Sequence, residues 1–112
     1  MSIEHVYQKD FNPPLGSRWD FVIKTLGLIT SKRPDNDLRI IHYNTGVDFE
    51  ISYNGECEGT LAVIAVPTYY DETNELDEFS IEYCGAYAGD SRYCSDWPNF
   101  WRVLNWELDN RM

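Results

Sequence analysis

Residues 47–53 alternate strictly between apolar and polar side chains, and this alternation constrains the fold more than any other feature. The apolar members are Val47, Phe49, Ile51 and Tyr53, and the polar residues between them are Asp48, Glu50 and Ser52. Successive side chains of a strand point to opposite faces of its sheet. The segment therefore predicts a strand with one buried face and one acidic, solvated face.

Two helices are predicted, one before and one after the strand-rich middle of the chain. Ser17 is a favourable N-cap for the first helix, and Pro34 ends it. Its apolar face is predicted to contain Trp19, Val22, Ile23, Leu26 and Ile29. Ser95 or Asp96 caps the second helix, and its first turn tolerates Pro98. Its apolar stripe is predicted to contain Trp97, Phe100, Trp101, Leu104 and Leu108. Trp106 lies off this stripe and is either a second core contact or an exposed anchor, and the usual burial of tryptophan favours the core.

The remaining strands are predicted at residues 38–43, which are rich in β-branched side chains, and at 61–66, an apolar run of the length of a buried strand. A further strand is predicted around Phe79–Tyr83, where apolar residues again alternate with polar ones. Asn54-Gly55 signals a hairpin after the acidic strand. A three-residue loop would place Phe49 and Val47 opposite members of the set Gly59, Leu61 and Val63. A slip of one residue would turn carboxylates toward the apolar face, so burial favours this odd-numbered loop.

These elements predict a single α+β domain spanning residues 1–112, with an irregular N-terminal arm at 1–16 in which residues 3–7 form at most a short edge strand. Its sheet is antiparallel with about four strands, and the order is helix, strands, helix. Both helices pack on one face, which leaves an acidic open face.

Negative charge is concentrated in the middle of the chain. The net charge is −10, and no lysine or arginine occurs between Arg39 and Arg92. The acidic residues in that interval are Asp48, Glu50, Glu56, Glu58, Asp71, Glu72, Glu75, Asp77, Glu78, Glu82 and Asp90. Such one-sided charge repels itself in a compact protein, so it favours a role in binding a partner. Solubility alone is the alternative explanation.

The candidate binding site combines the acidic sheet face with the acidic loop that follows it. Alternate strand residues are about 6.5 to 7 Å apart and neighbouring strands about 4.8 Å apart, so carboxylates there form a grid comparable to phosphates along a nucleic-acid strand. The predicted partner-binding residues are Asp48, Glu50, Glu58, Asp71, Glu72, Glu75, Asp77, Glu78 and Glu82, with Tyr69 and Tyr70 as contact residues.

The sequence contains no recognisable catalytic or metal-binding motif. The acidic loop lacks the glycine and the spacing of an EF-hand. The cysteines (Cys57, Cys84, Cys94) and histidines (His5, His42) lack the close spacing of zinc ligands. His42 is expected to be a strand residue with a satisfied hydrogen bond. We therefore expect no catalytic residue, no metal and no cofactor. A Cys84–Cys94 disulfide is disfavoured, because no secretion signal is evident.

The charge pattern predicts a small cytoplasmic inhibitor that is not an enzyme. It would bind a protein with a basic nucleic-acid-binding surface, such as a nuclease or a CRISPR effector, by mimicking phosphates. Phage anti-defence proteins, including anti-CRISPR and anti-restriction proteins, have this size and charge, which is an analogy of type only. Direct binding to nucleic acid or to a membrane is not expected.

Two alternatives remain open at this stage. An immunity protein that neutralises a cognate nuclease toxin would rely on the same charge steering and aromatic anchors. A ligand-binding or enzymatic α+β domain would instead need a concave apolar pocket, which Tyr43, Tyr53, Tyr83 and His42 are placed to line.

Overall fold

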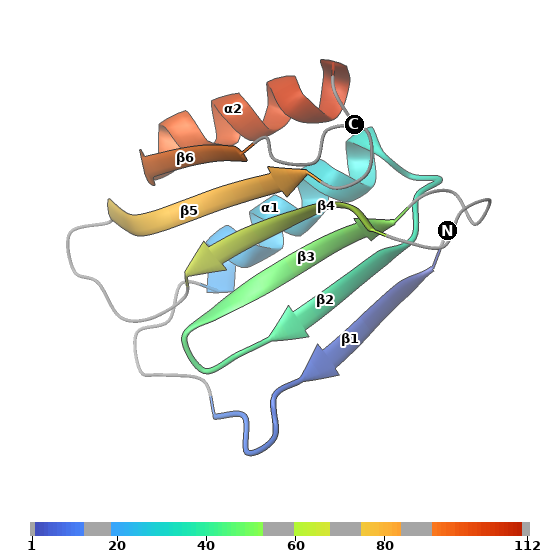
Figure 1. Cartoon of the computed structure of the whole chain (residues 1–112), viewed down its shortest axis with the longest axis vertical. Coiled ribbons are helices and arrows are strands. Elements are labelled where there is room, and N and C mark those ends of the chain that lie inside the picture. Colours follow the sequence, from blue (N-terminus) through green and yellow to red (C-terminus); the bar gives the residue numbers. More distant parts are fainter. Residues whose placement is uncertain (1, 13–18, 53–59, 68–74, 84–90, 111–112) are drawn as a thin grey trace.

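The computed structural model describes residues 2–12, 19–52, 60–67, 75–83 and 91–110, and for 75–78, 83 and 95 it describes the backbone only. Within these residues the elements are β1 (Ile3–Tyr7), α1 (Trp19–Lys32), β2 (Leu38–His42), β3 (Gly46–Ser52), β4 (Thr60–Pro67), β5 (Glu75–Tyr83), β6 (Ser91–Asp96) and α2 (Trp97–Asn110). The strands form one sheet in the order β1-β2-β3-β4-β5-β6 (Figure 1).

The predicted antiparallel sheet of about four strands, flanked by helices, is wrong. The described residues form a six-stranded mixed sheet, and the element order is strand, helix, strands, helix. β1 pairs with β2 in parallel, whereas each later pair is antiparallel. A parallel pair needs a crossover connection, and α1 provides it. β1 also shows that part of the predicted irregular arm belongs to the sheet.

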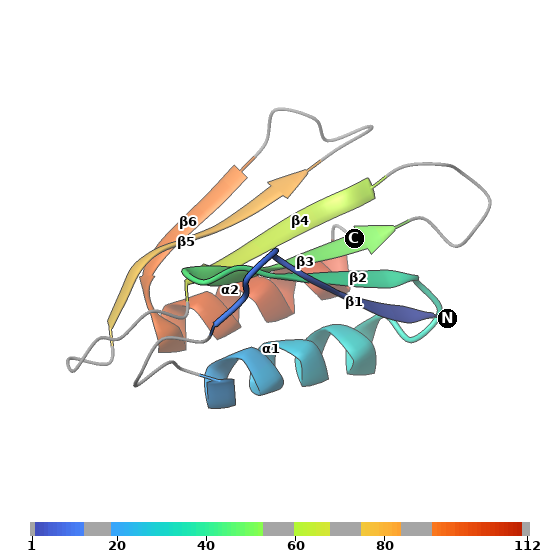
Figure 2. The ribbon, with the colours of Figure 1, turned by 90° about the horizontal axis from the view of Figure 1, so that it is seen from below.

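Both helices lie on the same side of the sheet, as Figure 2 shows from the edge. The core between them is formed by buried side chains from every strand from β2 to β6 and by the apolar stripe of α2. Phe79 of β5 packs against Phe100 of α2, with ring centroids 3.7 Å apart. Phe21 of α1 stacks on Trp97 of α2 at 4.4 Å, so the two helices also pack against each other.

The predicted helix faces are largely correct, with two exceptions. Trp97, Phe100, Leu104 and Leu108 are buried, as their spacing predicted. Ile23 and Trp106 are instead 64% and 53% exposed, so the prediction that they are core residues is wrong. On α1 the buried side is completed by Thr25, whose hydroxyl donates to the Phe21 carbonyl at 2.8 Å and so needs no other partner.

The N-terminus of α2 and its contact with β6 use polar groups. The Asn99 backbone N–H donates to Asp96 Oδ1 at 2.9 Å, which identifies Asp96 as the N-cap. Farther along the helix, Glu107 is 1% exposed and accepts a hydrogen bond from Arg92 Nε at 2.9 Å. This ion pair joins α2 to β6 on the inner side of the sheet.

The predicted register between β3 and β4 is wrong, although both strands are present, and the shift is an odd number of residues, so the faces of β4 are exchanged. Phe49 lies opposite Ile64, and Val47 lies opposite Val66. The strands end at Ser52 and begin again at Thr60, and a register irregularity follows Ile51. The predicted three-residue loop falls within residues 53–59, which lie outside the described residues. Val63 consequently lies opposite Glu50 on the open face, instead of joining the core.

An aromatic cluster holds the edge strand β1 against the sheet. His42 is buried, stacks on Tyr7 with ring centroids 4.5 Å apart, and contacts Phe11 and Trp19 at 5.9 Å each. Its Nε2 lies 3.0 Å from Nδ1 of His5. Its Nδ1 is buried and has no hydrogen-bond partner among the described residues. The predicted hydrogen bond of His42 is therefore present at Nε2 only.

Candidate protein-binding face

The side of the sheet opposite the helices carries the outward residues of all six strands. Its members follow from the register, because residues paired across neighbouring strands share a face. They are Glu4 and Val6 of β1, Arg39 and Ile41 of β2, Asp48 and Glu50 of β3, Val63 and Ala65 of β4, Ser80 and Glu82 of β5, and Ser91 and Tyr93 of β6. We call this surface the open face.

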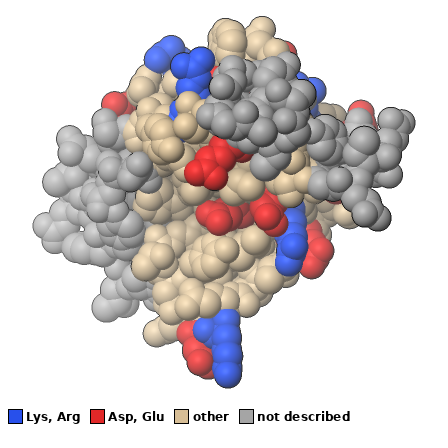
Figure 3. Space-filling view, in the orientation of Figure 1, with Lys and Arg blue, Asp and Glu red and all other residues tan. Residues whose placement is uncertain are grey.

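Three carboxylates gather at the centre of the open face, and we call them the acidic trio: Asp48, Glu50 and Glu82. Asp48 and Glu50 are alternate residues of β3, and Glu82 of β5 is aligned with Glu50 across Val63 of β4. Figure 3 shows acidic side chains near the centre of the view, and the described surface below them is mainly uncharged. The trio therefore presents concentrated negative charge on a face whose other described residues include Val6, Ile41, Val63, Ala65 and Tyr93.

Burial and neighbouring charge both disfavour the ionised form of Asp48. Partial burial raises the pKa of this carboxyl most, and Glu50 and Glu82 raise it further. A hydrogen bond from the Tyr43 hydroxyl lowers the pKa and so opposes part of this effect. The pKa of Tyr43 is itself raised, mainly by desolvation and then by Asp48 and Glu50. Tyr43 thus remains a donor at neutral pH.

Among the described residues, one base lies close to the acidic trio. Arg39 Nη1 lies 3.9 Å from Glu50 Oε1, and the two residues are paired across β2 and β3. Within the described part of the chain, Asp48 and Glu82 have no lysine or arginine within ion-pairing distance. The sequence analysis missed Arg39 as a member of this face. The signal was available, since Leu38 and Ile40 are apolar and Arg39 between them must point outward.

The other predicted partner-binding residues are only partly located. Glu75, Asp77 and Glu78 belong to the backbone of β5, but their side chains lie outside the description. Glu58, Tyr69, Tyr70, Asp71 and Glu72 lie outside the described residues. The described structure therefore brings together Asp48, Glu50 and Glu82 from the predicted set.

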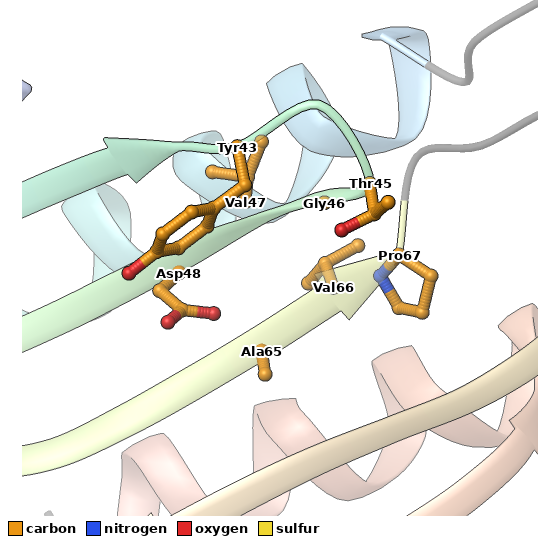
Figure 4. Close-up of a pocket in the computed structure, with 8 residues that line it drawn as sticks. All are labelled: Tyr43, Thr45, Gly46, Val47, Asp48, Ala65, Val66 and Pro67. Carbon is orange, nitrogen blue, oxygen red and sulfur yellow. The ribbon is translucent and has the colours of Figure 1, made fainter. Parts of the chain in front are cut away.

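A shallow hollow of about 280 Å³ adjoins the acidic trio at one end of β3 and β4. It is lined by Tyr43, Thr45, Gly46, Val47, Asp48, Ala65, Val66 and Pro67. Figure 4 shows the Tyr43 ring and the Asp48 carboxylate at one end, with Thr45 and Pro67 at the other. Gly46 has no substitute here, because a Cβ would lie 2.8 Å from the Val66 carbonyl oxygen.

The pocket predicted for a ligand-binding domain is not assembled from its described members. Tyr43 lines the hollow on the open face, whereas His42 is buried in the aromatic cluster on the helix side. Tyr53 lies outside the described residues, and of Tyr83 only the backbone is described. Cys94 is buried and is not in a disulfide, while Cys57 and Cys84 lie outside the described residues.

The described residues provide neither a metal site nor a membrane span. No group of three or more His, Cys, Asp or Glu side chains there is arranged to hold a metal ion. Neither described helix combines the length and the apolar character that crossing a membrane requires.

Comparisons with protein-family models, with curated proteins and with solved structures found no match to this chain. The geometry of the open face is therefore the observation from which a function can be inferred.

Proposed function

We propose that the protein is a small inhibitor that binds a nucleic-acid-handling protein through the open face. The acidic trio would occupy positions on the partner that phosphates otherwise fill. The observation that carries this proposal is the acidic trio itself, gathered on the side of the sheet that neither helix covers.

Electrostatics supports a basic partner. Asp48 and Glu82 have no base partner among the described residues, and the net charge of the chain is −10. A surface patch that carries charge of one sign attracts a protein of opposite charge and so increases the rate at which the two associate. The uncharged remainder of the face, including Val63, Ala65 and Tyr93, supplies surface of the kind that interfaces bury.

The experiment captures a partner from bacterial lysate with the immobilised protein and then adds double-stranded DNA or RNA. We expect a protein that itself binds nucleic acid, and we expect nucleic acid to release it. The affinity should fall steeply as salt increases, because both surfaces are charged. A partner that does not bind nucleic acid, or that remains bound when nucleic acid is added, would contradict phosphate mimicry.

Two triple variants with equal change in net charge locate the binding surface. The first replaces Asp48→Asn, Glu50→Gln and Glu82→Gln on the open face. The second replaces Asp20→Asn, Asp35→Asn and Asp109→Asn, which are exposed and lie outside the open face. We expect the first variant to lose about tenfold in affinity for each carboxylate that pairs closely with a partner base. The second should bind nearly as the wild type does, and equal losses would contradict a specific role for the open face.

A further inference from the structure

The hollow beside Asp48 has a polar end and an apolar floor. The polar end is formed by the Asp48 carboxylate and the hydroxyl of Tyr43. Ala65 and Pro67 of β4 provide apolar lining beside and beyond that end (Figure 4). Ala65 is directly opposite Asp48 in the sheet, so a small side chain leaves the space beside the carboxylate open.

The carboxylate at the end of this hollow is uncompensated. No base among the described residues is within ion-pairing distance of Asp48, and the nearest described base on the face, Arg39, is paired with Glu50. Asp48 is also partly withdrawn from water, and Glu50 and Glu82 add repulsion. A cation placed in the hollow would relieve both penalties at once.

The shape of the hollow selects the kind of cation. A long side chain with an apolar stem and a charged head places its methylene groups on apolar surface and its head on the charge. Lysine and arginine both have this form. The Tyr43 ring beside the carboxylate favours arginine, because a guanidinium stacks on an aromatic ring and pairs with a carboxylate through two hydrogen bonds.

We propose that the hollow formed by Tyr43, Asp48, Ala65 and Pro67 is a socket for one arginine side chain of the partner. The inference rests on the proposed function, since it names the partner group that the open face receives. The apolar lining of the hollow makes this proposal more specific than attraction between opposite charges, because the methylene groups of the arginine side chain must also fit into the hollow.

The socket is tested with the whole protein and three short peptides in place of the partner. Each is an acetylated and amidated Gly-X-Gly tripeptide, in which X is arginine, lysine or norleucine. The measurement is a titration followed by NMR, using the backbone amides of Gly46 and Ala65 and the carboxyl carbon of Asp48. We expect saturable shifts at these positions with the arginine peptide, binding at least threefold weaker with lysine, and no saturable shift with norleucine.

Two pairs of variants separate the socket from the surrounding charge. Ala65→Leu fills the hollow without changing charge, and its control Ser80→Leu adds the same side chain on the adjacent strand outside the hollow. We expect Ala65→Leu to abolish the shifts and Ser80→Leu to preserve them. Asp48→Asn should weaken arginine binding at least fivefold, whereas Glu4→Gln, on the same face at β1, should leave it unchanged.

Equal binding of arginine and norleucine peptides, or arginine binding that survives Ala65→Leu, would overturn the socket. These outcomes are independent of the lysate experiment. If the peptides fail while the open-face triple variant still loses its partner, the socket is wrong and the proposed function stands. If the peptides bind as expected and no nucleic-acid-binding partner is captured, the socket stands and the proposed function is wrong.

Discussion

Asp48 combines partial burial with two acidic neighbours, and both features raise its pKa above the ordinary value of 3.8. A carboxyl with a raised pKa in the folded state binds its proton more tightly there than in the unfolded chain. The stability that it contributes is therefore present at low pH and is lost as the pH rises from 3.8 through the folded-state pKa. At neutral pH the charge of Asp48 opposes folding.

Asp48→Asn should consequently stabilise the protein at pH 7. We expect an increase of about 0.5 kcal/mol in the free energy of unfolding, which is the scale of removing like-charge repulsion on one face of a sheet. Asparagine retains an oxygen that accepts the Tyr43 hydrogen bond, so no polar group is left unpaired. Urea unfolding measures the change, and the gain should disappear below pH 3.8. Glu82→Gln is the control, with a smaller gain because Glu82 is exposed. A loss of stability in Asp48→Asn would contradict this account of the site.

At the scale of elements, β1 depends on a histidine that must remain neutral. Burial lowers the pKa of His42 from its ordinary value of 6.5, and the nearby His5 lowers it further. A histidine with a depressed pKa is protonated first in the unfolded chain. Its contribution to stability is present above pH 6.5 and is lost as the pH falls from 6.5 toward the folded-state pKa.

We therefore expect the free energy of unfolding to fall when the pH is lowered from 7.5 to 5.5. The loss is limited to about 1.4 kcal/mol per pH unit for one proton. His42→Phe keeps the ring that packs against Tyr7 and Trp19 and removes the titrating group. Urea unfolding at both pH values should show a smaller loss for this variant. A loss of the same size in the wild type and in His42→Phe would exclude His42 as its cause.

The elements that could be predicted are those whose own residues determine them. The stripe of α2, its Asp96 cap and the alternation of β3 are local patterns, and the structure shows each of them. β6 could not be recognised in this way. In β6 the residue that points toward the helices at position 92 is a charged arginine, so the strand lacks an apolar alternation. The arginine is tolerated there because it pairs with Glu107 of α2. β1 has the same character, since His5 and Tyr7 face the helix side but remain exposed, and both stack on His42, which is distant in sequence.

The prediction of the register between β3 and β4 was wrong for a related reason. Burial of apolar residues is satisfied equally well by Leu61 and Val63 or by Ala62 and Ile64, because residues 61–66 are all apolar. The alternation of β3 therefore fixes its own faces but not those of β4. The position of the acidic trio was predictable from β3 and β5 alone, whereas the hollow required knowledge of Ala65 and its place opposite Asp48.

At the scale of the whole molecule, a net charge of −10 opposes the compact state through self-repulsion. Salt screens such repulsion, with a Debye length of about 10 Å at 0.1 M ionic strength. We expect the melting temperature to rise by a few degrees when sodium chloride is increased from 20 to 300 mM, which corresponds to about 1 kcal/mol for a domain of this size. Calorimetry or circular dichroism at fixed pH measures the rise.

The two triple variants used for binding also show where the repulsion originates. Both reduce the net charge equally, but the open-face variant removes carboxylates that lie beside one another, whereas Asp109 of the control is paired with Lys32 at 3.0 Å. If the repulsion is local to the acidic trio, the salt-induced rise should shrink more in the open-face variant than in the control. An equal reduction of the rise in both variants would mean that the net charge determines the repulsion and that the position of the carboxylates does not. A melting temperature that falls with salt would show that attractive ion pairs outweigh the repulsion between like charges. The acidic face would then not destabilise the folded protein, and a basic partner would have no repulsion to relieve.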